Sequence, residues 1–366
     1  MPSIVSPGIV AMIIAVLALV TTTPAATVET PEIGALWDEE CPPCNTLFSK
    51  LEENSDGRFV QNVAIQERGE PKSGTGFMFE WAGGALVHTC DYLNSHFGDK
   101  SCTINWKVTK GVGLEYCTVT FEPQLRVDSA NCPCNDVERV SITISSRLKH
   151  QLPVSNKCRL KHDVGLPSQK VCTFGDGTRP QNYSELMHCM KESMKRRTCA
   201  INDDREQMVP MRDPRPEVVS AYFEAVRVHH LTGETVDEYV AKMLPVFCQW
   251  MAIRYTLATG ILDEQSTVYW YDDALNDPLW WHYRWLHAAG LQLPRAVVSE
   301  AAEAAKRNEF GFRVKGVDLH PGGEDVHPNR SYENEVSPET LETFDSVLRT
   351  WLPPVLLDKF GVPHDE

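Results

Sequence analysis

The pattern of apolar and polar residues along this chain predicts strands and helices in mixed order. Val60, Val63, Ala64 and Ile65 are consistent with a strand, and residues 77–97 carry apolar side chains at helical spacing. Segments 103–108, 116–121 and 140–145 alternate or are rich in β-branched residues, which indicates strands. Further helices are expected over four segments: 184–197, 234–259, 294–306 and 337–351. With 366 residues and 42% hydrophobic content, the chain fits one large α/β domain better than two.

The first residues have the features of a targeting segment. Residues 8–20 are uncharged and apolar, and the small residues Ala25 and Ala26 follow, as at a signal-peptide cleavage site. Thirteen apolar residues are few for a membrane span, and no Lys or Arg precedes Lys50. The sequence therefore favours a cleaved signal peptide over 1–26, with a short membrane anchor as the alternative. Residues 27–58 are polar and read as an N-terminal extension.

The cysteine content indicates an oxidising compartment. There are twelve cysteines, an even number that permits complete pairing, although the connectivity does not follow from sequence. Two glycosylation signals, at Asn182 and Asn329, would be used if the chain enters the secretory pathway.

A loop rich in small residues separates the first strand from the helix that follows. Residues 70–77 read Glu-Pro-Lys-Ser-Gly-Thr-Gly-Phe. Free backbone N–H groups at a helix N-terminus bind anions, so this loop is a candidate phosphate site, with an ordinary turn as the alternative. The nucleotide-binding loop of ATPases has its lysine after the last glycine, whereas Lys72 precedes Gly74 here. An ATP or GTP loop of that kind is not expected.

A second segment combines an arginine with a helix start. Arg212 is followed by Asp213 and Pro214, and Ser220 lies eight residues after Arg212. The planar guanidinium of arginine binds two phosphate oxygens in parallel. Asp213 can also be read as an N-cap with Pro214 at the first helical position, and both readings can hold together.

These two motifs, in this order, resemble sulfotransferases. The order Pro-Lys-Ser-Gly-Thr resembles their 5′-phosphosulfate loop, and the Arg212 segment resembles their 3′-phosphate motif. Segments 267–278 and 285–291 resemble a later structural part of the family, so the resemblance runs from about residue 60 to the C-terminus. It implies a three-layer, doubly wound parallel sheet of the P-loop-like type over 59–366. Residues 101–147 have no counterpart and are expected to form a disulfide-containing, β-rich insertion.

The resemblance also implies which residues bind 3′-phosphoadenosine 5′-phosphosulfate (PAPS), the sulfuryl donor. Lys72 would meet the bridging oxygen, backbone and hydroxyl groups of the loop would hold the 5′-phosphate, and Arg212 with Ser220 would hold the 3′-phosphate. Phe77 would face the adenine or be an ordinary core residue, and Arg330 is a further possible contact or a solvated loop residue. The donor-binding residues are therefore expected to be Lys72, Ser73, Gly74, Thr75, Gly76, Phe77, Arg212, Ser220 and Arg330.

Three residues are candidates for the general base. The expected reaction requires no metal. His162 and His150 lie in short Lys-His segments near the family's histidine position, and a histidine suits proton abstraction near neutral pH. Glu80 is the glutamate alternative, with a helix-surface carboxylate as its ordinary reading. His162 is placed slightly above His150, and both above Glu80.

The sequence thus predicts a PAPS-dependent sulfotransferase of the Golgi lumen or the secreted fraction. The formal charge of −15 argues against a nucleic-acid partner. A carbohydrate hydroxyl is the favoured acceptor, with protein tyrosine and small alcohols open, and membrane association is expected only if the N-terminal segment is retained. Two alternatives are a nucleotide kinase, which the order of the loop argues against, and a secreted nucleotide-binding protein without transferase activity, which the glycine at position 76 leaves open.

Overall fold

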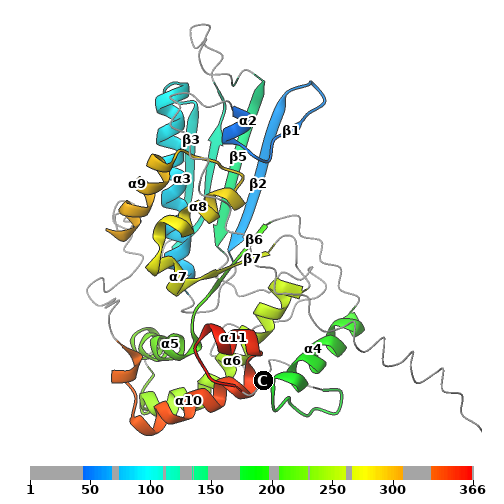
Figure 1. The fold of residues 1–366 in the computed structure, drawn as a ribbon, viewed down its shortest axis with the longest axis vertical. Helices are drawn as coiled ribbons and strands as arrows, with labels where there is room; N and C mark the ends of the chain where they lie inside the picture. The colour runs from blue at the N-terminus through cyan, green and yellow to red at the C-terminus, as the bar shows by residue number, and fades with distance from the viewer. Residues whose placement is uncertain are drawn as a thin grey trace, which may run out of the picture. The chain divides into compact units, whose positions relative to one another are not determined.

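One β-sheet organises the part of the chain that the computed structural model describes, namely residues 44–67, 74–109, 113–123, 134, 136–146, 174–197, 206–229, 231–260, 266–307 and 331–364. The sheet has seven strands in the order β3-β4-β5-β2-β6-β7, with β1 paired to β2 (Figure 1). Their bounds are β1 Glu52–Glu53, β2 Phe59–Glu67, β3 Cys102–Thr109, β4 Gly113–Phe121, β5 Val137–Ser146, β6 Glu206–Met211 and β7 Ser266–Trp270.

The centre of this sheet is parallel. Strands β5, β2, β6 and β7 run in the same direction, whereas β3, β4 and β1 are joined to it by antiparallel pairs. The fold is therefore mixed α/β with a parallel centre, as predicted, but the sheet as a whole is mixed. The segment expected as a β-rich insertion, 101–147, supplies three strands of this same sheet, and β5 lies next to β2. A local pattern of β-branched residues predicts a strand without predicting its partner, which is why the sequence did not place them.

The helices expected from the sequence are present. Their bounds are α2 Cys44–Leu47, α3 Thr75–Phe97, α4 Tyr183–Arg197, α5 Pro214–His229, α6 Val236–Gly260, α7 Tyr271–Asn276, α8 Pro278–Ala288, α9 Arg295–Lys306, α10 Pro338–Trp351 and α11 Pro354–Lys359, with the 3₁₀ turn Tyr332–Asn334. The predicted start of α10 is confirmed, since the Ser337 hydroxyl accepts a hydrogen bond from the backbone N–H of Thr340 at 3.2 Å. Within these described residues, no helix is long and apolar enough to cross a membrane.

Helix α3 packs along one face of the sheet, and α8 and α9 pack against α3 and against each other (Figure 1). Alternate residues of the strands point into this layer, so Val63 and Ile65 of β2 and Ile142 and Ile144 of β5 are buried. The opposite face is packed at β6 and β7, where α6 contacts both strands. Over β4, β5 and β2 that opposite face carries polar, exposed or half-buried residues: Asn62, Thr118, Thr120, Ser141 and Thr143. Helices therefore contact both faces of the sheet at β6 and β7.

The residues before β2 belong to the same core as the sheet. Leu47 and Phe48 are fully buried, and the Phe48 ring lies 5.4 Å from that of Phe121 on β4. The Leu47 carbonyl accepts a hydrogen bond from the N–H of Gln292 at 2.9 Å. Residues 44–58, expected to be the end of an extension, are thus packed into the domain because two large apolar side chains anchor them there.

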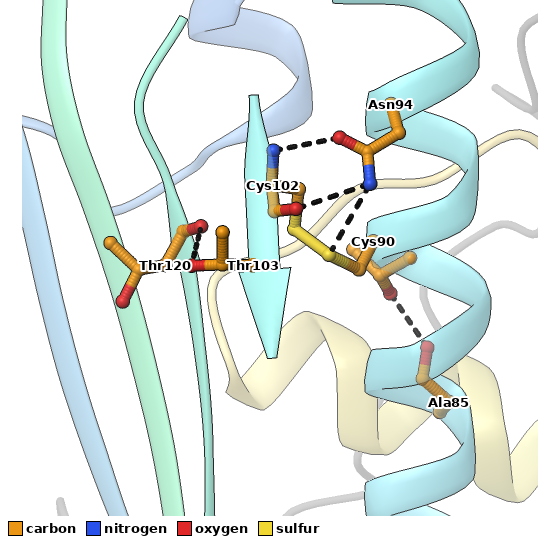
Figure 2. The surroundings of a disulfide bond; sticks show 7 residues. Ala85, Cys90, Asn94, Cys102, Thr103 and Thr120 are labelled. Atoms are coloured by element: carbon orange, nitrogen blue, oxygen red, sulfur yellow. Dashed lines mark hydrogen bonds between the residues drawn. A yellow bond between two sulfur atoms is a disulfide. The ribbon is translucent and has the colours of Figure 1, made fainter. Parts of the chain in front are cut away.

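Two disulfides tie the segment 101–147 to its surroundings. Cys90 of α3 is bonded to Cys102 at the start of β3, and Asn94 accepts a hydrogen bond from the Cys102 N–H at 2.8 Å and donates one to its carbonyl at 3.1 Å (Figure 2). Cys44 is bonded to Cys134, which precedes β5.

Complete cysteine pairing, which the even count permitted, is not realised. Cys117 and Cys248 are buried free thiols, and burial raises the pKa of both. A buried thiol packs as a small apolar group, so neither residue needs a partner.

The disulfide Cys44–Cys134 is expected to stabilise the domain more than Cys90–Cys102. The first closes a loop of 90 residues and the second a loop of 12. The loss of chain entropy in the unfolded state predicts contributions of about 4.5 and about 3 kcal/mol. All four cysteines are 2–3% exposed, so double alanine variants of each pair remove similar packing and serve as mutual controls. Urea denaturation should show the larger loss for Cys44→Ala/Cys134→Ala; equal losses would contradict the entropic account.

Candidate active site

The candidate site lies where the parallel strands end. The chain leaves β2 through α3 to reach β5 on one side of β2, and later returns as β6 on the other side. In open α/β sheets, such a reversal of strand order opens a crevice beyond the carboxyl ends of the strands, where ligands bind. The predicted phosphate loop follows β2, Arg212 directly follows β6, and Tyr271 directly follows β7.

Gly74 lies within the predicted phosphate loop and directly precedes α3 in a left-handed conformation. Its φ is 91° and its ψ is 13°, and its carbonyl accepts the first helical hydrogen bond, from the N–H of Met78, at 2.9 Å. A Cβ atom at this position would lie 2.4 Å from Cδ2 of Tyr271. Position 74 therefore requires glycine for two reasons: the positive φ of the backbone and the close approach of the Tyr271 ring.

Arg212 is held in place by Ser220 and Tyr271. Its Nη1 donates to the Ser220 hydroxyl at 3.4 Å, and its guanidinium carbon lies 4.6 Å from the ring centroid of Tyr271. Its Nε is buried and has no hydrogen-bond partner in the described part of the chain. A buried N–H without a partner is costly unless an anion completes its hydrogen bonds, so the half-buried Arg212 side chain suits an anion site.

Two carboxylates lie near Arg212, and they differ in their partners. Burial raises the pKa of Asp272 and the charge of Arg212 opposes that rise, so Asp272 interacts with Arg212, whereas Asp213 is bound by Arg215. Asp213 accepts hydrogen bonds from the Arg215 backbone N–H at 2.9 Å and from the Arg215 side chain at 2.6–3.0 Å. Asp213 thereby caps α5, with Pro214 as the first helical residue. The predicted helix start is confirmed, and the Nε–H of Arg212 keeps no hydrogen-bond partner in the described part of the chain.

The rings of Phe77 and Tyr271 contact each other beside Gly74. The Phe77 ring centroid lies 4.2 Å from that of Trp81 and 5.1 Å from that of Tyr271, edge-on. Phe77 is half-buried in these contacts, which fits the reading of a packed residue on the first turn of the helix. Tyr271 lies in the segment 267–278, which was expected to be structural, so the sequence did not predict it as a site residue. Its place directly after a strand, like that of Arg212, was a usable signal.

Glu80 is not the exposed surface carboxylate that its helical position suggested. It lies on α3 one turn past Phe77 and is half-buried. This burial raises the pKa of its carboxyl group to about 7. A carboxyl group with this pKa exchanges a proton near neutral pH, as a general base must.

His282 of α8 is the one fully buried histidine among the described residues. Its Nδ1 donates to the Pro278 carbonyl at 2.7 Å, its ring stacks on Trp81 at 5.2 Å, and burial lowers its pKa to about 4. It is therefore neutral at physiological pH and serves as a packed core residue.

Several predicted site residues lie outside the described residues. These are Lys72, Ser73, His150, His162 and Arg330, together with the signal segment 1–26. Thr75 and Gly76 form the first two residues of α3. Of the predicted donor-binding residues, the structure brings Arg212 and Ser220 into contact and places Gly74 and Phe77 against the same tyrosine that stacks on Arg212. Within the described ranges, no cluster of three or more His, Cys, Asp or Glu side chains has the arrangement of a metal site.

Comparison with known proteins gives little direct help. No protein family model matches the sequence, and no curated protein sequence matches it either. Among solved structures, mouse sulfotransferase SULT7A1 complexed with PAP is similar over 85% of this chain and 98% of its own, with 10% sequence identity and a TM-score of 0.39. A TM-score this low does not establish a shared fold, so the proposal below is drawn from the residues of this chain.

Proposed function

We propose that this protein is a sulfotransferase that transfers the sulfuryl group of PAPS to an acceptor hydroxyl or amine. The observation that carries the proposal is the geometry of Arg212, whose guanidinium is held by Ser220 and Tyr271 and keeps an unused buried donor. An arginine prepared in this way at the end of a parallel strand suits a phosphate, because its charge and planar donors match two phosphate oxygens.

The donor would span two subsites at this edge of the sheet. Its 3′-phosphate would lie at Arg212 and Ser220, and its 5′-phosphosulfate at the loop before α3, where the helix N-terminus presents free N–H groups. Tyr271 contacts Arg212 and closes against Gly74, so it would hold the two subsites in a fixed relation.

In the reaction, the bond between sulfur and the bridging oxygen breaks as a bond forms from sulfur to the acceptor. The negative charge that develops on the leaving phosphate would be stabilised by Lys72, and the acceptor proton would pass to a general base. Glu80 is the candidate base among the described residues because its pKa lies near neutral pH. His162 and His150, which the sequence ranked above Glu80, lie outside the described residues and stay predicted bases.

The compartment and the acceptor are part of the proposal. The two disulfides fit the oxidising secretory route that the cysteine content predicts. On that route the commonest acceptor hydroxyls belong to glycans, so a carbohydrate acceptor is proposed, in the Golgi lumen or outside the cell.

Calorimetric titration with 3′-phosphoadenosine 5′-phosphate (PAP), the product nucleotide, tests the proposal directly. We expect PAP to bind in preference to ATP, and Arg212→Ala to weaken PAP binding by roughly 100-fold, since charge-assisted hydrogen bonds contribute about 1.5–3 kcal/mol each. Lys72→Ala should weaken it as well. Arg58→Ala is the control, because Arg58 donates to the Val137 carbonyl at the opposite end of β2.

Preference for ATP, or unchanged PAP binding in Arg212→Ala, would contradict the donor site. Transfer of labelled sulfate from PAPS to glycan acceptors then separates an enzyme from a binding protein. PAP binding without transfer to any acceptor would identify the protein as a secreted nucleotide-binding protein without transferase activity.

A further inference from the structure

Residues near the C-terminus contact both segments that enclose Arg212. One segment continues from β6 as Asp213 into α5, and the other continues from β7 as Tyr271 into α7. The residues that reach both of them are Lys359, the last residue of α11, and Phe360, which follows it. They lie more than eighty residues from either segment in the sequence.

The first contact runs through Arg215. While its guanidinium holds the Asp213 carboxylate, its Nη2 also donates to the Phe360 carbonyl at 2.8 Å. The side chains of Arg215 and Asp213 are only 17% and 14% exposed, so solvent screens this pair weakly. The position of Asp213, and hence of the backbone that leaves Arg212, is tied to the chain at residue 360.

The second contact runs through Lys359. Its Nζ donates to both carboxylate oxygens of Asp273, at 2.7 and 2.9 Å, and lies 5.3 Å from the ring centroid of Trp270. The Phe360 ring packs edge-on against the same Trp270 ring at 5.7 Å. Trp270 directly precedes Tyr271 and Asp273 follows it by two residues, so the backbone is held on both sides of the tyrosine that stacks on Arg212.

We infer that Lys359 and Phe360 are positioning residues for the phosphate subsite at Arg212. They hold Asp213 on one side and Tyr271 on the other, and thereby set the direction in which the guanidinium presents its donors. An arginine binds a phosphate through two parallel hydrogen bonds only in a narrow range of orientations, so loosening either side lowers affinity for a group at that position. This inference rests on the proposed function, which assigns the 3′-phosphate to Arg212.

The test compares two nucleotides that differ only in the 3′-phosphate. Calorimetric titration with PAP and with adenosine 5′-monophosphate gives the preference for the 3′-phosphate in each variant. We expect Lys359→Met to lower this preference about fivefold or more, which corresponds to about 1 kcal/mol, and Lys359→Arg to restore it. Because the Lys359–Asp273 pair is more than a third exposed on both sides, the unfolding midpoint should hardly move.

Asp273→Asn separates positioning from simple charge attraction. Removing a negative charge near the subsite would strengthen phosphate binding through space, whereas loss of positioning weakens it, so a reduced preference in both Lys359→Met and Asp273→Asn supports the inference. Arg349→Met is the matched control: Arg349 donates to the Pro363 carbonyl at 3.1 Å and so holds the same C-terminal segment without contact to either side of Arg212.

Three results would overturn the inference. The first is a stronger preference for PAP over adenosine 5′-monophosphate in Asp273→Asn. The second is an unchanged preference in Lys359→Met. The third is a loss of preference in Arg349→Met equal to that in Lys359→Met. If the unmodified protein itself does not prefer PAP to adenosine 5′-monophosphate, the proposed function fails instead, which keeps the two failures distinguishable.

Discussion

Replacing Gly74 with alanine is expected to abolish binding of the nucleotide donor while the domain still folds. The new Cβ would lie 2.4 Å from the Tyr271 ring, too close for any pair of carbon atoms, and the φ of 91° is strained for alanine. Tyr271 must then move, and it is the residue that stacks on Arg212. Both phosphate subsites are therefore disturbed by one methyl group.

Backbone strain alone would not abolish PAP binding, so the expected loss of binding comes from the clash with Tyr271. A second glycine separates the effect of the clash from that of the strain. Gly177 has nearly the same φ, 85°, but no atom lies within 4 Å of a Cβ built there. Gly177→Ala should lose about 1 kcal/mol of stability and keep PAP binding. In Gly74→Ala, PAP titration should show no measurable heat, and circular dichroism should show that the helices are retained. Normal PAP affinity in Gly74→Ala would mean that the Gly74–Tyr271 contact does not shape the site.

Replacing Glu80 with glutamine is expected to lower the rate of sulfuryl transfer strongly. If Glu80 is the general base, it acts as the carboxylate, so the transfer rate should rise with pH through about 7 and then level off. Glu80→Gln should lower the rate by roughly 10²–10⁴-fold with little change in PAP affinity. Asp91→Asn, an exposed carboxylate on the same helix, is the control. A retained rate in Glu80→Gln would return the role of base to the histidines, His162 and His150.

The same substitution has a stability signature whose sign follows from the pKa shift. Burial raises the pKa of Glu80 from 4.5 to about 7, so the folded state binds more protons between these values. Stability from this group is therefore complete below about 4.5 and is lost as the pH rises through 7, by up to about 3 kcal/mol. The pKa of His282 is lowered from 6.5 to about 4, so its contribution is present above 6.5 and is lost as the pH falls towards 4.

The two groups thus oppose each other over the range in which both titrate. Urea denaturation of the unmodified protein should show little net slope from this pair between about pH 4.5 and 6.5. Glu80→Gln removes one contribution, and its free energy of unfolding relative to the unmodified protein should increase as the pH rises from 4.5 to 7. A difference that stays constant with pH would show that Glu80 is not buried as a proton-binding group.

The sequence was sufficient for features that depend on neighbours along the chain. Apolar spacing predicted β2 and the long helices, and the Asp213-Pro214 pair predicted where α5 begins. The sequence also placed the first candidate phosphate contact in the loop after β2, and the second, Arg212, just before a helix. These features follow from backbone geometry and capping, which act over a few residues.

Only the tertiary structure decided the features that join distant parts of the chain. Strand pairing is not encoded in the period of a single strand, so the sequence left open that β3 and β4 extend the sheet antiparallel and that β5 lies beside β2. The same holds for the bond from Cys44 to Cys134, for the burial that raises the pKa of Glu80, and for Tyr271 at Arg212. Each depends on which surfaces meet in three dimensions, because burial and close contact are properties of packed pairs and not of a local pattern.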